Sequence, residues 1–275
     1  IDGWLACGRL EEARALDRKD PLRRFRDRFH IPKGATYLCG NSLGLQPKKA
    51  AEYVNEELRD WAELGVEAHH KSRHPWVSYH ELVTGMSAKL VGAKPVEVVV
   101  MNTLTVNLHL MMVSFYRPTP TRFKIIIEKG AFPSDRYAVL SQIRCHGLDP
   151  ATALVELSPR HFDEVLKEND ILEAIEREGA ATALVLLGNV NYLTGQAFDM
   201  GPIVAASRRA GARVGFDLAH GAGNLKLNLH DDGPDFAVWC SYKYLNAGPG
   251  GLSGCFVHER HARAKLPRFE GWWGT

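Results

Sequence analysis

Short apolar runs rich in β-branched residues alternate with longer amphipathic stretches along most of the chain. Such runs are typical of buried strands, and their alternation with helices is typical of a mostly parallel sheet with helices on both faces. The sequence therefore predicts an α/β fold. The expected strands are 96–101, 124–128, 183–187, 213–217, 236–240 and 252–258.

Stretches with helical periodicity lie between these strands and before the first of them. Between them we expect helices at 105–116, 133–146, 169–179 and 201–211. An amphipathic helix is expected at 47–64, where apolar residues recur at spacings of three and four, and where they would pack against the body or a partner subunit. We therefore expect two parts, an N-terminal helical arm at 1–70 and a large α/β domain at 71–275.

Composition narrows the class of protein. The 275 residues are 45% hydrophobic and 24% charged, as in an ordinary globular protein, and the net charge is only +2. The basic cluster at 23–28 is interrupted by Asp27, which favours a solvated face over a nucleic-acid footprint. No apolar run approaches the roughly eighteen residues of a membrane helix. The five cysteines lack a C-x-x-C pair, which indicates reduced thiols and predicts a cytoplasmic protein.

One lysine lies where an amine is costly. In "WCSYKYLN" (239–246), Lys243 follows the apolar run 236–240 at the point where a strand leaves the core. Desolvation lowers the pKa of a buried amine, which makes it a nucleophile able to form a Schiff base. The alternative is a lysine that extends to solvent from a strand end.

Other strand ends carry polar or aromatic groups. Thr103 and Thr105 lie at an expected helix start, which is an anion site or a plain N-cap. Phe132 follows the second strand, near Ser134 and Asp135, and Asp217 ends the fourth. Because ligands bind beyond the carboxyl ends of parallel strands, these groups are expected to meet.

Asp217 and Lys243 lie on consecutive expected strands. A structural buried ion pair would explain both. The alternative is pyridoxal 5'-phosphate between them, because that cofactor needs a lysine for its aldehyde, an acid for its pyridine nitrogen, an aromatic face and an anion site for its phosphate. All four parts are present on different strands, which favours the cofactor.

Longer motifs carry a family resemblance. They are "GNSLGLQPK" (40–48), "MNTLTVNLHLMMVSFYRPTPTRFKI" (101–125), "AFPSDRYA" (131–138), "GFDLAHGAGN" (215–224), "CSYKYLNAGPGG" (240–251) and "EGWWG" (270–274). From about Leu16 onward the chain resembles the kynureninase family, which belongs to the fold type I, class V aminotransferase-like enzymes that use pyridoxal phosphate.

The resemblance implies a role for each matching residue. It makes Lys243 the residue that binds the cofactor aldehyde, Asp217 the partner of the pyridine nitrogen and Tyr242 a phosphate ligand and proton relay. The other cofactor residues that it implies are Leu104, Thr105, Phe132, Ser134, Asp135 and His220, with Trp272 reaching the phosphate site of a neighbouring subunit in a homodimer. Ser42 and His69 match positions near the aromatic end of the substrate, although "HHKSRHPW" (69–76) departs from the family pattern.

The resemblance also implies a reaction. It is the hydrolysis of L-kynurenine or 3-hydroxy-L-kynurenine to anthranilate or 3-hydroxyanthranilate and L-alanine, in tryptophan catabolism and NAD biosynthesis; the sequence does not distinguish the two substrates. The family continues into a smaller C-terminal domain with the arginine that clamps the substrate carboxylate. We therefore expect a fragment with impaired turnover.

Two other functions and one weak motif compete with this interpretation. The chain would fit another class V enzyme, a cysteine desulfurase or aminotransferase, although no cysteine lies in an obvious mobile loop. It would also fit a non-catalytic truncated remnant. "HERH" (258–261) spaces its histidines three apart after a strand, unlike the zinc-protease motif, so we expect no metal site there or at His69, His70 and His74.

Overall fold

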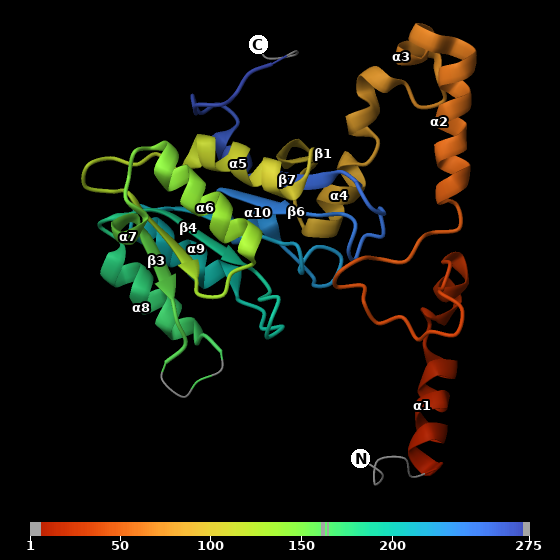
Figure 1. Ribbon diagram of the computed structural model, residues 1–275, viewed down its shortest axis with the longest axis horizontal. Helices are drawn as coiled ribbons and strands as arrows, with labels where there is room; N and C mark the ends of the chain where they lie inside the picture. The colour runs from red at the N-terminus through yellow and green to blue at the C-terminus, as the bar shows by residue number, and fades with distance from the viewer. Residues whose placement is uncertain (1–6, 161–162, 164, 272–275) are drawn as a thin grey trace.

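The computed structural model describes residues 7–160, 163 and 165–271 of the chain. Its centre is a seven-stranded sheet in the order β1-β7-β6-β5-β4-β2-β3 (Figure 1). The strands are β1 Val98–Met101, β2 Lys124–Glu128, β3 Leu154–Leu157, β4 Thr182–Gly188, β5 Arg213–Asp217, β6 Phe236–Trp239 and β7 Ser253–Val257. From β3 through β6 the neighbours pair in parallel, and β7 runs antiparallel to both β1 and β6. The expected α/β fold with a mostly parallel sheet is confirmed.

The described chain holds ten helices, and those from α4 onward cover both faces of this sheet. They are α1 Cys7–Lys19, α2 Ala50–Leu64, α3 Ala68–Lys71, α4 Thr84–Val91, α5 Leu104–Phe115, α6 Pro133–Cys145, α7 Pro150–Ala153, α8 Glu168–Glu178, α9 Met200–Arg209 and α10 Leu229–Asp232. Short 3-10 turns are η2 Arg23–Arg28, η3 Gly65–Glu67, η4 Trp76–Glu81, η5 Pro95–Glu97 and η6 Glu259–His261. The five helices expected from periodicity correspond to α2, α5, α6, α8 and α9.

The pleat of each strand divides the core into two layers. In β4, Leu184 and Leu186 point to the layer built with α5 and α6, while Val185 and Leu187 point to the layer built with α4, α8 and α9. Because β4 is apolar on both faces, it can only lie inside a sheet that helices cover on both sides. The carboxyl ends of the parallel strands are thereby held in fixed register.

Two parts of the sheet differ from expectation. Val96 and Glu97 lie in η5 instead of a strand, because Pro95 opens a turn and the Glu97 carboxylate accepts a hydrogen bond from the Lys94 N–H at 2.9 Å. The edge strand β3 was not predicted, since its four residues follow α7 directly and only one of them is buried.

The helices of the N-terminal arm lie beside the α/β body (Figure 1). None of the residues of α2 is buried, and its apolar residues Tyr53, Val54, Leu58 and Trp61 are 50–65% exposed. The arm reaches the body through the loop that precedes α2, where Gly44 meets the segment that carries Lys243.

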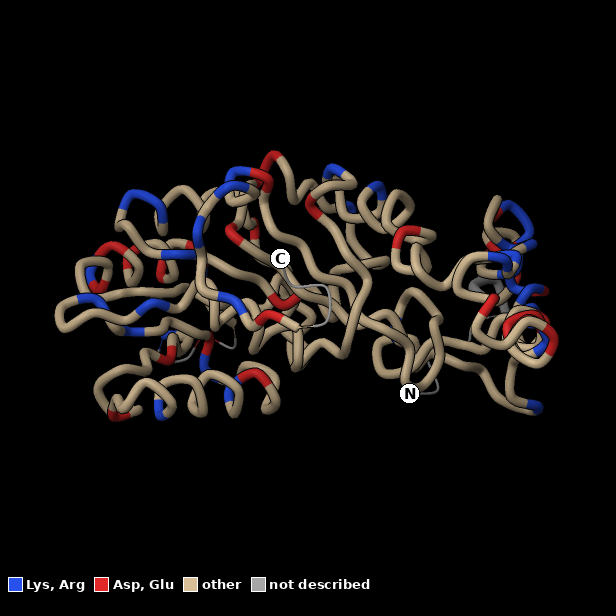
Figure 2. The backbone as a smooth tube through the Cα atoms, turned by 90° about the horizontal axis from the view of Figure 1, so that it is seen from above, with Lys and Arg blue, Asp and Glu red and all other residues tan. Residues whose placement is uncertain are grey.

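Charge is mixed over the described chain. Figure 2 shows Lys and Arg interspersed with Asp and Glu along the helices of the body and of the arm. Among the described residues, no helix combines the length and the apolar character needed to cross a membrane.

Candidate active site

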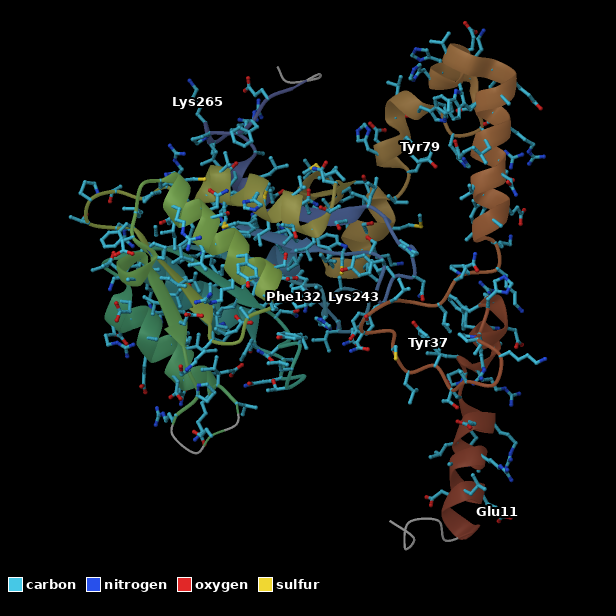
Figure 3. The ribbon with its side chains drawn as sticks, viewed as in Figure 1. Glu11, Tyr37, Tyr79, Phe132, Lys243 and Lys265 are labelled. Atoms are coloured by element: carbon cyan, nitrogen blue, oxygen red, sulfur yellow. The ribbon has the colours of Figure 1, made fainter. Side chains whose placement is uncertain are left out.

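The carboxyl ends of β2, β4 and β5 meet the segment that follows β6. Gly188, the last residue of β4, pairs in register with Asp217, the last of β5. One pocket at this edge is lined by four of the predicted residues, Phe132, Asp217, His220 and Lys243. The sheet therefore brings together side chains that are far apart in the sequence, and Figure 3 shows Phe132 beside Lys243.

Lys243 is buried, with 7% of its surface exposed. Its Nζ lies 3.0 Å from Nε2 of His220 and 5.6 Å from the centroid of the Phe132 ring. Burial and the neighbouring ammonium lower the pKa of His220, so a neutral imidazole accepts a hydrogen bond from the lysine. The amine is thus directed into the pocket and does not extend to solvent from a strand end.

Asp217 and Asp135 form a buried acidic pair. Asp217 is 7% exposed, and its Oδ1 accepts a hydrogen bond from the Ala219 N–H at 2.6 Å. Asp135, in the first turn of α6, is 8% exposed, and burial followed by the nearby Asp217 raises its pKa well above the usual range. Asp135 therefore holds its proton more firmly than an exposed carboxyl group does.

Two helix starts converge on the other side of the pocket. Thr105 at the start of α5 and Ser134 at the start of α6 place their hydroxyl oxygens 3.0 Å apart. The side chain of Thr103, the N-cap residue of α5, makes no capping hydrogen bond. The uncapped N–H groups at the start of α5, with the two hydroxyls beside them, form a setting that suits a phosphate.

Tyr242 lies one residue before the lysine, half-buried, with its hydroxyl hydrogen-bonded to the Cys240 thiol. Burial raises the pKa of Tyr242 to about 12, so the phenol is neutral and able to donate a proton. Burial likewise raises the pKa of the Cys240 thiol, and that of Cys255 to about 12. Both thiols are therefore poor nucleophiles, unlike the cysteine that a desulfurase needs.

The remaining predicted residues have different placements. Leu104 begins α5 beside Thr105. Ser42 is exposed on the arm loop, two residues before Gly44. His69 lies in α3 and packs edge-on against Trp76, with ring centroids 5.6 Å apart, in the part of the arm that Figure 1 places away from the sheet. Trp272 lies outside the described residues.

Three residues at this edge were not predicted. Tyr192 stands edge-on to Phe132, with ring centroids 5.2 Å apart, and lines the pocket with Glu128. The sequence feature that identified Asp217, an acidic residue at the end of an apolar strand, is also present at Glu128. Gly44 donates its N–H to the Tyr242 carbonyl at 2.8 Å, and a Cβ at this position would lie 2.3 Å from the Lys243 carbonyl oxygen. No local sequence pattern indicates such a contact.

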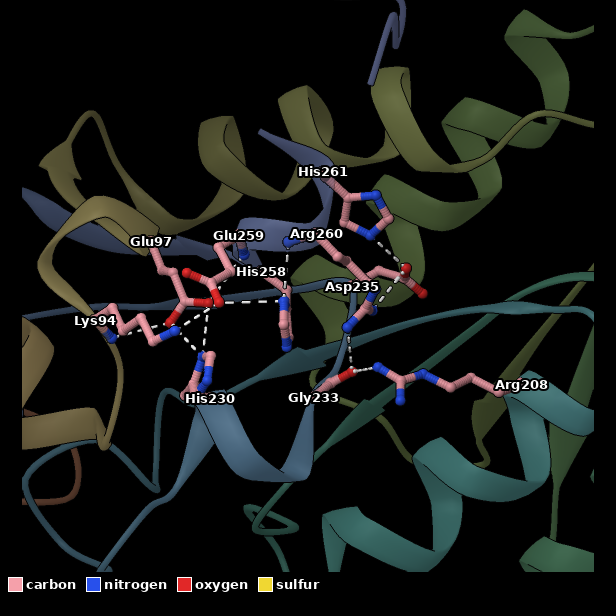
Figure 4. A network of polar contacts seen from close by, with 10 residues as sticks. All are labelled: Lys94, Glu97, Arg208, His230, Gly233, Asp235, His258, Glu259, Arg260 and His261. Atoms are coloured by element: carbon pink, nitrogen blue, oxygen red, sulfur yellow. Dashed lines mark hydrogen bonds and ion pairs between the residues drawn. The ribbon is translucent and has the colours of Figure 1, made fainter. Parts of the chain in front are cut away.

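The histidines of "HERH" belong to a separate polar network (Figure 4). Glu97, His230 and His258 place ligand-type atoms within 4.8 Å of one another, the one such cluster found among the described residues. The Glu97 carboxylate already accepts hydrogen bonds from the backbone of Lys94 and Glu259, and His230 lies 3.0 Å away. Burial and Arg260 lower the pKa of His258. These contacts form a structural network. The cationic side chains beside it disfavour the binding of a divalent metal ion.

A second part of this network surrounds Asp235, the residue before β6. Its carboxylate accepts hydrogen bonds from His261 at 2.7 Å, from Arg260 at 2.9 Å and from the Val214 N–H at 2.8 Å. Because Asp235 precedes β6 and Lys243 follows it, the network fixes the end of the strand opposite to the pocket.

The pocket fits pyridoxal phosphate in four respects. A buried amine faces an aromatic ring, a buried carboxyl group lies at the end of β5, the start of α5 with two hydroxyls beside it offers a phosphate site, and Oδ1 of Asp135 is buried without a hydrogen-bond partner among the described residues. An unsatisfied buried acceptor at this place is consistent with a group that the pocket is built to receive.

Comparison with known proteins gives the same assignment. The model of the aminotransferase class-V family matches residues 36–271. Kynureninase of Myxococcus xanthus is 69% identical over 95% of this chain, and kynureninase of Koribacter versatilis is 60% identical over 94% of it. The chain spans only 63% and 62% of the lengths of these two relatives.

Solved structures share the fold. A C-DES mutant with glycine covalently linked to the PLP cofactor superposes with a TM-score of 0.75 at 19% identity, over 90% of this chain and 63% of that one. The Escherichia coli cysteine desulfurase CsdA has a TM-score of 0.71 at 20% identity, over 91% of this chain and 61% of that one. Since the family model covers most of the sequence, the chain belongs to the aminotransferase class-V family.

Proposed function

We propose that this chain carries the pyridoxal-phosphate site of a kynureninase. The reaction would be hydrolysis of L-kynurenine or 3-hydroxy-L-kynurenine to anthranilate or 3-hydroxyanthranilate and L-alanine. The observation that carries the proposal is the meeting of Lys243, Asp217, Phe132 and His220 in one pocket of a chain that is 69% identical to a protein named kynureninase.

Each residue has a chemical task in this proposal. When bound, the cofactor supplies an electron sink for the bonds around the substrate Cα. Lys243 would hold the cofactor aldehyde, and its amine would take the proton from the substrate Cα. His220 accepts a hydrogen bond from Lys243 and so orients its Nζ. Asp217, buried at the end of β5, would hold the pyridine nitrogen of the cofactor.

The later proton transfer falls to Tyr242. Its pKa, raised to about 12 by burial, keeps the phenol protonated at neutral pH. It can therefore donate a proton to the substrate Cβ when water has added to the γ-carbonyl and the Cβ–Cγ bond breaks. Thr105, Ser134 and the N–H groups at the start of α5, beginning at Leu104, would hold the phosphate.

We propose further that the enzyme is a cytoplasmic homodimer with an N-terminal arm at 1–70 and a cofactor domain at 71–275. The exposed apolar face of α2 supports the dimer, because a face of this kind is normally covered by another surface. The free thiols Cys39, Cys145, Cys240 and Cys255 support a reducing compartment. In the dimer, Trp272 would reach the partner's phosphate site.

The chain spans less than two thirds of its relatives' lengths, so full turnover is a separate proposal. We propose that Ser42 and His69 lie near the aromatic end of the bound substrate.

The test separates cofactor binding from turnover. The chain and its Lys243→Ala variant are incubated with pyridoxal phosphate, and absorbance is recorded before and after borohydride reduction. We expect a visible-edge band in the wild type that borohydride traps on Lys243, and no such band in the variant. Anthranilate release is then followed by fluorescence. A band that persists in the variant would contradict the role of Lys243. If the chain binds the cofactor but turns over cysteine and not kynurenine, the desulfurase alternative is favoured.

A further inference from the structure

A third carboxyl group, that of Glu128, lies in the pocket with Asp217 and Lys243. Glu128 is the last residue of β2 and is 3% exposed. Its two carboxyl oxygens accept the Gly188 N–H at 3.3 and 3.2 Å. Because Gly188 pairs in register with Asp217, the three residues form a row across the neighbouring strands β2, β4 and β5.

The contact between Glu128 and Gly188 is close. A Cβ at position 188 would lie 3.1 Å from Oε1 of Glu128, tighter than ordinary van der Waals contact. The absence of a side chain at Gly188 therefore lets the carboxyl group lie against the end of β4. There it acts on the backbone that pairs with Asp217, although its own strand is not adjacent to β5.

The groups that face Glu128 come from five other elements. They are Asp217 from β5, Asp135 from α6, His220 and Lys243 from the loops after β5 and β6, and Tyr192 from the loop after β4. Burial raises the pKa of Glu128 to about 7, the Gly188 N–H opposes this rise, and the charge of Asp217 adds to it. Glu128 therefore changes its protonation state near neutral pH.

We propose that Glu128 is a positioning residue for the pyridine end of the cofactor, which fixes the end of β4 and, when ionised, strengthens the hold of Asp217 on a protonated ring nitrogen. The inference rests on the proposed function, since it requires pyridoxal phosphate in this pocket. It differs from a purely structural role in one respect, because a structural contact would matter equally at every pH.

Two variants separate the charge of Glu128 from its contact. Glu128→Gln keeps an oxygen to accept the Gly188 N–H but cannot ionise, whereas Glu128→Asp keeps the charge and shortens the reach. Glu156→Gln is the matched control, because Glu156 lies on the neighbouring strand β3 and pairs with Arg136 outside the pocket. The dissociation constant of pyridoxal phosphate is measured by absorbance titration for each chain between about pH 6 and pH 8.5, the range around the Glu128 ionisation.

The ratio of the variant constant to the wild-type constant removes the contributions of groups that both chains share. For Glu128→Gln we expect a ratio near one at low pH that rises roughly tenfold at high pH, as a change of one pKa unit in a partner would give. For Glu156→Gln we expect a flat ratio. A flat ratio for Glu128→Gln would overturn this inference alone, while a wild-type chain that binds no pyridoxal phosphate would overturn the proposed cofactor as well.

If circular dichroism shows that Glu128→Gln does not fold, Glu128→Asp tests the inference instead. In Glu128→Asp the carboxyl group is farther from Gly188. The affinity for the cofactor should therefore change with pH by the same amount as in the wild type, but around a different midpoint pH. An unchanged midpoint in Glu128→Asp would overturn the inference. In either variant, a uniform loss of affinity at every pH would assign Glu128 to structure only.

Discussion

The amine of Lys243 and the imidazole of His220 lie 3.0 Å apart, with the Phe132 ring on another side of the amine. The two residues come from the loops after neighbouring parallel strands, β5 and β6. His220 is thus the direct polar contact of the residue that we assign to the cofactor aldehyde. The first prediction tests this contact.

Replacing His220 by Ala should weaken cofactor binding, because the buried Lys243 amine loses its acceptor. A hydrogen bond contributes about 0.5–1.5 kcal/mol, so the dissociation constant of pyridoxal phosphate should rise roughly two- to tenfold. His80→Ala is the control, since the His80 side chain is 58% exposed. Equal constants for wild type and His220→Ala, measured by absorbance titration, would exclude a positioning role for His220.

Gly44→Ala should disturb the lysine loop although position 44 lies on the arm. The new Cβ would fall 2.3 Å from the Lys243 carbonyl oxygen and 2.4 Å from Oδ1 of Asn246, so the backbone must move. Overpacking of this kind costs about 1–3 kcal/mol. Gly40→Ala is the matched control in the same loop, because nothing lies within 4 Å of its Cβ position.

Cofactor affinity and the thermal midpoint of unfolding report this effect. We expect Gly44→Ala to lose both affinity and stability and Gly40→Ala to keep both. If Gly40→Ala lost as much, the effect would reflect glycine flexibility in the loop and not the contact with Lys243.

The hydroxyls of Thr105 and Ser134 should act as a pair. They lie 3.0 Å apart at two helix starts, so removing either one releases the other. Thr105→Val and Ser134→Ala should each weaken pyridoxal phosphate binding, and the double variant should lose less than the sum, with a coupling of about 0.5–3 kcal/mol. Strict additivity in this double-mutant cycle would show that the two hydroxyls hold the phosphate independently.

Asp235 should stabilise the fold at neutral pH and cease to do so in acid. Burial alone would raise the pKa of this carboxyl, but hydrogen bonds from His261, Arg260 and the Val214 N–H outweigh burial and hold it below the usual 3.8. A depressed pKa adds stability above the unfolded-state value, and this stability is lost as pH falls through the folded-state value.

Asp235→Asn should therefore lower the free energy of unfolding at pH 7 by about 3–5 kcal/mol, as expected when one partner of a buried charged network is removed. The deficit should shrink below about pH 4, where the unfolded carboxyl becomes protonated. Urea unfolding at a series of pH values measures it. Asp231→Asn, at an exposed position, is the control, and a deficit for Asp235→Asn that is constant with pH would contradict the assignment.

The presence of Asp217 and Lys243 in one pocket could be predicted because consecutive β-α units usually place their strands side by side. Their strands, β5 and β6, are indeed neighbours. The position of Glu128 could not be predicted in this way. Its strand β2 lies between β3 and β4, so its approach to Gly188 depends on a strand order that hydrophobic patterns do not encode.

The direction of β7 and the contacts of the arm could not be predicted from the sequence either. The run 252–258 was correctly expected to be a strand, but its apolar pattern cannot show that β7 runs antiparallel to β6. The close approach of Gly44 to Lys243 joins residues about two hundred positions apart. Such a contact is fixed by the packing of the arm loop against the lysine segment, and a single glycine in a loop gives no sign of it.

The Gly44 N–H to Tyr242 carbonyl bond makes the amide proton of Gly44 a reporter of arm dynamics. The adjoining α2 has no buried residue in the single chain, so few contacts oppose transient local opening of this region. Each opening breaks the bond, exposes the Gly44 amide to solvent and withdraws support from the segment that carries Lys243. Hydrogen exchange at Gly44 therefore measures how often the lysine loop is released, and any surface that covers α2 slows both events together.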